Sequence, residues 1–143
     1  GVAARADKPV SEQDIKTVRV GTQAGTTLVP FAQDTLKVAS LDVFDDTASM
    51  FTALAAGKVD AVMTDLSITL GQAHNSNGRL SVVGKYKSSG ETAGIYPKGS
   101  PNGKIIDQLI EDMHKDGTLK KLEEAYLLPS WGTSPDKIPL WKP

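Results

Sequence analysis

Apolar positions along the chain change their spacing repeatedly, and this pattern predicts alternating strands and helices. Short β-branched or apolar runs predict strands at residues 1–6, 18–20, 37–44, 59–63 and 80–85. Apolar residues at helical spacing, each set preceded by polar or glycine turns, predict helices at residues 28–36, 48–56 and 67–73. Such alternation is typical of an α/β layered fold with a largely parallel sheet, whose ligands bind beyond the carboxyl ends of the strands.

The second part of the chain has a different character. A last strand is expected at residues 92–97, followed by helices at 104–115 and 119–127 and a proline-rich tail without regular periodicity. The first of these helices carries an apolar stripe, formed by Ile105, Ile106, Leu109, Ile110 and Met113. Trp131 and Trp141 in the tail need a surface on which to pack.

Composition narrows the possible functions. With 143 residues, 39% of them hydrophobic and 23% charged, the chain has the size and balance of one soluble domain. A net charge of −1 gives no electrostatic reason to expect nucleic acid as a partner. The chain has no cysteine, and its two histidines, His74 and His114, lack ligand spacing, so neither a metal nor a cofactor is expected. No apolar run reaches membrane-spanning length, and the first residues lack the apolar core of a signal peptide.

The stretch Val18–Thr27, VRVGTQAGTT, is a short strand, a glycine turn and two threonines before a helix. Backbone N–H groups at a helix start suit an anion such as a carboxylate. Thr26 and Thr27 are open to a second interpretation, because threonine more commonly caps a helix. A nucleotide phosphate is disfavoured, because the loop lacks both the spacing and the lysine of a phosphate-binding loop.

Acidic residues lie in and after the fourth expected strand, at Asp60 and Asp65. Asp65 follows that strand and precedes a helix, so either a cap or a functional acid fits it. Because the loop around Gly25 also joins a strand to a helix, we expect it to meet Asp65 at one sheet edge. No nucleophile elbow, cysteine nucleophile or serine with a nearby histidine points to hydrolysis.

The order of these signals resembles the second half of a family 3 periplasmic solute-binding protein, the type that captures polar amino acids for ABC importers. The resemblance spans residues 1–127 and is carried by the ordered combination of GTT, AGKVDAVMTD and DGTLKKLEEAY. It implies a type II periplasmic-binding-protein-like lobe. It also implies that Gly25, Thr26 and Thr27 bind the α-carboxylate of the ligand and that Asp65, as a buried aspartate, binds the α-ammonium.

The resemblance also implies how the chain is divided. Residues 1–94 correspond to the second, ligand-binding lobe, and residues 95–143 to a hinge strand, C-terminal helices and a tail that pack on a first lobe, which this sequence lacks. The first lobe supplies the arginine and most aromatic side chains that contact the ligand in the family. We therefore expect the stripe from Ile105 to Met113 to mediate self-association or pairing with a separate N-terminal half.

The expected function is non-catalytic binding of a polar amino acid for uptake through an ABC-transporter permease. The expected location is the periplasm or cell exterior, after removal of a signal peptide and with a lipid anchor on the full-length precursor. One alternative is an enzyme resembling cyclohexadienyl dehydratases, with Asp65 as acid or base, although no second catalytic group is evident. A further alternative is an extracytoplasmic sensory or structural module.

Overall fold

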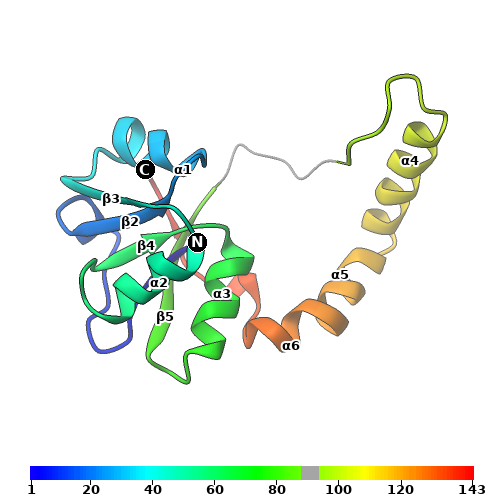
Figure 1. The fold of residues 1–143 in the computed structure, drawn as a ribbon. Coiled ribbons are helices and arrows are strands. Elements are labelled where there is room, and N and C mark those ends of the chain that lie inside the picture. The colour runs from blue at the N-terminus through cyan, green and yellow to red at the C-terminus, as the bar shows by residue number, and fades with distance from the viewer. Residues whose placement is uncertain (88–93) are drawn as a thin grey trace. The chain divides into compact units, whose positions relative to one another are not determined.

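A six-stranded sheet is the framework of residues 1–87 and 130–143 (Figure 1). The computed structural model describes residues 1–87 and 94–143. The strands follow the order β3-β2-β4-β1-β5-β6 across the sheet. Their bounds are Val2–Arg5 for β1, Arg19–Gln23 for β2, Ser40–Phe44 for β3, Ala61–Met63 for β4, Leu80–Tyr86 for β5 and Leu140–Trp141 for β6. The predicted α/β class and the first five predicted strands are confirmed, with boundaries that differ by a few residues.

The sheet is mixed, whereas the sequence pattern predicts a largely parallel one. Strand β2 runs parallel to β3 and β4, and β5 runs parallel to β6. Strand β1 lies between β4 and β5 and is antiparallel to both. Because β1 begins at the edge where its neighbours end, it adds no crossover connection of the kind that the alternation implied.

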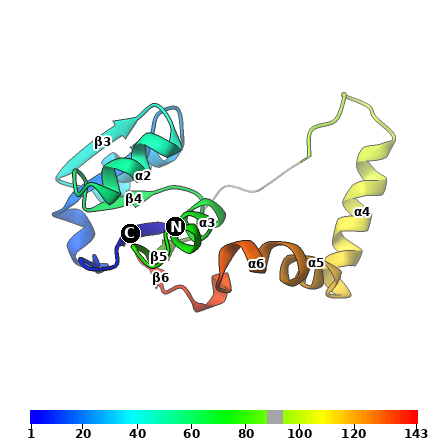
Figure 2. The same cartoon turned by 60° about the horizontal axis from the view of Figure 1, so that its bottom comes forward.

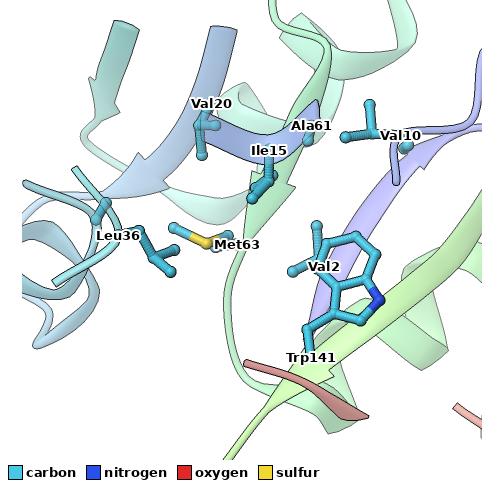
Figure 3. Close-up of a cluster of buried hydrophobic side chains, with 10 residues drawn as sticks. Val2, Val10, Ile15, Val20, Leu36, Ala61, Met63 and Trp141 are labelled. Carbon is cyan, nitrogen blue, oxygen red and sulfur yellow. The ribbon is translucent and has the colours of Figure 1, made fainter. Parts of the chain in front are cut away.

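Apolar side chains on both faces hold the central strands, as the alternation of side chains along a strand requires. Val2 and Ala4 of β1 lie in one buried cluster with Trp141, while Ala3 between them belongs to the other cluster. Figure 3 shows the first cluster, in which Met63 and the tail residue Trp141 lie on the same side of the sheet. The central strands are therefore covered on both faces, which fixes the register of the strands that carry the candidate site.

Helices cover the two faces separately. On one face, α2 (Thr47–Ala55) and α3 (Leu66–Asn75) contribute to the second cluster. On the other face lie η1 (Asp14–Lys16), α1 (Leu28–Pro30) and the π-helix η2 (Phe31–Leu36). The helix predicted at 28–36 is thus one α turn that continues as a π-helix, and the change occurs at Pro30, which has no N–H to donate.

A second unit spans residues 88–129, and its helices lie in the described part, residues 94–129. It contains α4 (Asn102–Lys115), α5 (Thr118–Leu122), the π-helix η3 (Glu123–Leu127) and the start of α6 (Leu128–Trp131). Of the strand expected at 92–97, residues 92 and 93 lie outside the described residues, and residues 94–97 form no strand. Among the described residues, no helix combines the length and apolarity that a membrane crossing requires.

The apolar stripe of α4 is largely uncovered within the described chain. Ile105, Leu109 and Ile110 are 60%, 54% and 45% exposed, while Ile106 and Met113 are half-buried.

The tail folds back onto the sheet unit, so the division of the chain differs from the expected split at residue 94. Residues 1–87 and 130–143 form one compact unit, and residues 88–129 form the other. Strand β6 pairs with the end of β5, with Tyr86 opposite Trp141, and Trp141 is 6% exposed (Figure 2). The physical reason is burial of this indole, which was expected to need a surface, although the sequence did not indicate that the surface is the sheet.

Candidate functional site

The candidate site lies at one edge of the sheet, where parallel strands end. Strands β2 and β4 are adjacent and in register, with Val20 opposite Ala61 and Gly21 opposite Val62. The loop after β2 carries Gly25, Thr26 and Thr27, and Asp65 follows β4. Because β2 and β4 are parallel neighbours, both segments leave the sheet at the same edge. The predicted convergence of the threonine loop and Asp65 at one edge is confirmed.

The two threonine hydroxyls of the loop after β2 differ in their bonding, and neither caps the following helix. Gly25 adopts a positive φ of 71° and turns the chain after β2. The Thr26 hydroxyl donates to the carbonyl of Gln23 at 2.8 Å. Thr27 occupies the N-cap position of α1, but its side chain makes no cap hydrogen bond. Since Thr27 is also exposed, its hydroxyl is accessible to an anion.

Asp65 stands at the N-cap position of α3, but its carboxylate does not bond to the helix. Its backbone carbonyl accepts from the Thr69 amide at 3.0 Å, whereas its side chain makes no cap hydrogen bond. Asp46, at the start of α2, provides the contrast, because its Oδ1 accepts from the Ser49 amide at 2.7 Å. Of the two interpretations of Asp65, the geometry therefore does not show the side-chain cap.

Asp65 is exposed in this structure, which corrects the expectation of a buried aspartate. The position at the end of a strand and before a helix projects the carboxylate beyond the sheet edge. An exposed carboxylate is hydrated, and its attraction for a ligand cation is weaker than at a buried position.

An amino group already lies beside Asp65. The Gly1 nitrogen donates to the carbonyl of Thr64 at 2.7 Å. Burial lowers the pKa of this amine to about 6, while the negative charge of Asp65 acts in the opposite direction and favours the cation.

The loop between β3 and α2 reaches the same edge, and it was not predicted as part of the site. The Gln23 side chain, at the end of β2, accepts from the Thr47 hydroxyl at 2.9 Å and lies 3.5 Å from the Asp45 carbonyl. This pair of contacts ties the start of α2 to the threonine loop. The available sequence signal was the position of Gln23 as the last residue of a strand that precedes the loop.

Metal chemistry finds no support in the described residues. No group of His, Cys, Asp or Glu side chains within residues 1–87 and 94–143 has the arrangement of a metal site. The chemistry available at the edge is a set of hydroxyl and amide donors on one loop and a carboxylate on the next.

Comparisons with known proteins find amino-acid-binding proteins. The chain is 28% identical over 114 residues to the L-cystine-binding protein TcyJ of Escherichia coli, a match that covers 79% of this chain and 43% of TcyJ. Its fold superposes on an ancestral arginine-binding protein bound to glutamine with a TM-score of 0.64 and 30% identity, covering 87% of this chain and 57% of that one. No family model matches. The chain therefore spans about half the length of the proteins that it resembles.

An enzyme is also among the similar structures. An ancestral cyclohexadienyl dehydratase matches with 30% identity and a TM-score of 0.52, covering 88% of this chain and 55% of that one. At equal identity, the superposition on the arginine-binding protein is better. The fold is the type II periplasmic-binding-protein fold in either case.

Proposed function

We propose that this chain, a relative of amino-acid-binding proteins, contributes one half of an amino-acid-binding site. The premise is that the chain matches about half the length of those proteins. The threonine loop of Gly25, Thr26 and Thr27 binds the α-carboxylate, and Asp65 binds the α-ammonium. One observation carries the proposal. Asp65 and Thr27 both stand at helix starts on the same sheet edge, and neither side chain is used as a cap.

The charges of an amino acid match this arrangement. The α-carboxylate accepts hydrogen bonds from hydroxyl and amide donors, which the loop after β2 exposes. The α-ammonium donates to a carboxylate, and Asp65 lies on the neighbouring strand connection. A zwitterion placed across the two segments satisfies both charges. The exposure of Thr27 and Asp65 leaves the ligand hydrated, so the affinity of this half alone is expected to be low.

The test is a binding screen of the standard amino acids and cystine against the full chain, by thermal shift and then calorimetry. Asp65→Ala is expected to weaken binding of the best ligand by about tenfold or more, because a charge-assisted hydrogen bond is lost. Asp107→Ala, which removes an exposed carboxylate from α4, serves as the charge-matched control. Unchanged affinity of the Asp65 variant contradicts the ammonium site, and loss of affinity in the control shows a nonspecific charge effect.

A second element of the proposal concerns the stripe of Ile105, Ile106, Leu109, Ile110 and Met113. Its exposure on α4 favours a protein partner, either a second copy of this chain or a separate N-terminal lobe. Size-exclusion chromatography with light scattering tests self-association, and a monomer at every concentration removes that option. If amino acids do not bind and a partner protein binds the stripe, the sensory or structural alternative gains support.

The match to an ancestral dehydratase supports a second candidate function, with Asp65 as the acid or base. The proposal is nevertheless non-catalytic, because the better superposition is on a binding protein. If the chain turned over a cyclohexadienyl substrate and Asp65→Asn abolished that activity, the enzymatic function would be favoured over the non-catalytic one.

Transport and location follow from the binding proposal. A chain that binds an amino acid for an importer delivers it to an ABC-transporter permease, in the periplasm or at the cell exterior. The proposed precursor carries a signal peptide and a lipid anchor. Fractionation of cells that express the native gene, together with copurification of the permease, tests both points.

A further inference from the structure

A pocket lies at the edge of the sheet opposite Thr27 and Asp65. It has a volume of about 400 Å³ and is lined by Arg5, Asp7 and Arg79 together with Ala6, Ala55 and Gly78. This volume falls within the range of small-molecule sites. Strand β1 connects the two edges, from Gly1 beside Asp65 to Arg5 in the pocket, a path of about 13 Å at the usual rise per residue.

The strand register places the two arginines on neighbouring strands, one position apart along the ladder. Arg5, the last residue of β1, lies opposite Leu80, the first residue of β5. The next residue, Ala6, donates its amide to the carbonyl of Arg79 at 2.9 Å. The sheet itself therefore holds the two arginine backbones together, although they are far apart in the sequence.

Both guanidinium groups are oriented by their Nε atoms, and Nη1 of Arg5 also lies against Gly57, in the space that a Cβ there would take. Arg5 donates from Nε to Asp7 at 3.2 Å, and Arg79 donates from Nε to the carbonyl of Ser76 at 3.1 Å. Within the described residues, neither arginine has a protein hydrogen bond from its terminal Nη atoms. A guanidinium with free terminal N–H groups binds the oxygens of a carboxylate or phosphate in a forked geometry.

The charge balance of the pocket favours an anion. Asp7 is the only acidic side chain in its lining, and at 79% exposure it is hydrated and screens Arg5 weakly. Two cations face one exposed carboxylate, so an oxyanion adds favourable charge without displacing a buried ion pair. Ala55 and Leu80 supply an apolar wall for a short carbon chain.

We propose that this pocket binds a small oxyanion, a carboxylate or phosphoryl compound, through Arg5 and Arg79. The site is separate from the proposed amino-acid site, and either proposal can fail without the other. The bound anion bridges the end of β1 and the start of β5 through the two arginines.

The test is an NMR titration of the full chain with inorganic phosphate and, separately, with citrate, following the amides of Ala6 and Gly78. Both amides are expected to shift in a saturable manner with either or both anions at physiological ionic strength. Saturation by citrate alone assigns the carboxylate class, and saturation by phosphate alone assigns the phosphoryl class. Absence of a saturable shift with both anions overturns the proposal.

Matched variants separate a built site from general charge attraction. Arg79→Gln is expected to raise the Kd by about tenfold, because a bidentate charge-assisted contact is lost. Lys16→Gln removes the same charge from an exposed side chain outside the pocket and is expected to leave the Kd unchanged. Equal weakening by both variants overturns the site, since it shows binding to the overall charge alone. Amide spectra of each variant without anion verify that its fold is intact.

Discussion

The indole of Trp141 lies against the backbone of Gly84, in the space that a Cβ at position 84 would take. Strand β6 is only two residues long, so this contact and the edge-on packing of the indole on Tyr86 help its short ladder to hold the tail. A glycine in the middle of a strand usually weakens it, and here close approach of another side chain explains its presence.

We expect Gly84→Ala to lower the free energy of unfolding by about 1–3 kcal/mol, because the added methyl displaces the indole. Gly71→Ala is the matched control. Gly71 lies inside α3, and a Cβ at this position meets no atom within 4 Å. Alanine at that helical position is expected to stabilise the protein by up to about 1 kcal/mol. Urea denaturation measures both, and similar effects of the two substitutions contradict the packing argument.

Tyr86 is the next contact of the tail and carries a buried hydroxyl that has no hydrogen-bond partner within the described chain. Its ring also packs edge-on against Phe31 at a centroid distance of 5.3 Å. We expect Tyr86→Phe to stabilise the protein by about 1 kcal/mol, because an unsatisfied buried polar group is removed while the ring contacts remain. Tyr126→Phe, at a position 74% exposed, is expected to have no effect on thermal stability. A destabilising Tyr86→Phe reveals a partner for the hydroxyl.

The ion pairs of Asp60 can be tested by measuring stability at low pH. Its carboxylate accepts from Lys8 Nζ at 2.9 Å and from Arg19 Nε at 2.9 Å, and Arg19 above all holds its pKa well below the ordinary value of 3.8. This contribution to stability is present above the ordinary pKa and disappears as the pH falls below it. At neutral pH we expect Asp60→Asn to cost about 1–3 kcal/mol in chemical denaturation, and the difference from the parent protein to shrink in acid. A difference that stays constant down to low pH argues against the ion pairs.

The Gly1 amine predicts a pH dependence of the same sign, but near neutrality. Its pKa falls from 8.0 to about 6 on burial, so between these values the unfolded chain binds more protons than the folded one. In a preparation that begins at Gly1, unfolding free energy is therefore expected to rise as the pH increases from about 6 to about 8. Acetylation of the amine should abolish this slope. Asp65→Asn should lower the amine pKa further, which NMR titration of the Gly1 signals measures.

Two aspartates at helix starts make a paired test of the candidate site. Asp46 accepts from the Ser49 amide, whereas the Asp65 side chain makes no cap hydrogen bond. We expect Asp46→Ala to cost about 1 kcal/mol of stability through loss of the cap. Asp65→Ala should leave stability nearly unchanged and weaken amino-acid binding. If both variants lose stability equally, Asp65 is a structural residue.

Local sequence signals predict the part of this fold whose chemistry is local. The strand, glycine turn and threonines at 18–27 form β2, its loop and α1, and Asp65 follows β4 as the pattern indicates. The tail was beyond such reasoning, because Trp141 packs on a glycine whose strand is distant in sequence. The exposure of Asp65 and the pairing of Ala6 with Arg79 likewise depend on tertiary arrangement, which periodicity does not encode.

The position of β1 has a consequence for how the chain folds. The first strand of the sequence lies between β4 and β5, so its backbone groups remain unpaired until residues 61–63 and 80–86 are available. During synthesis, β2 and β3 can pair before β1 has any partner. Folding of the sheet is therefore expected to be limited by late, long-range closure around β1, and the nascent chain carries an unprotected strand edge until that step.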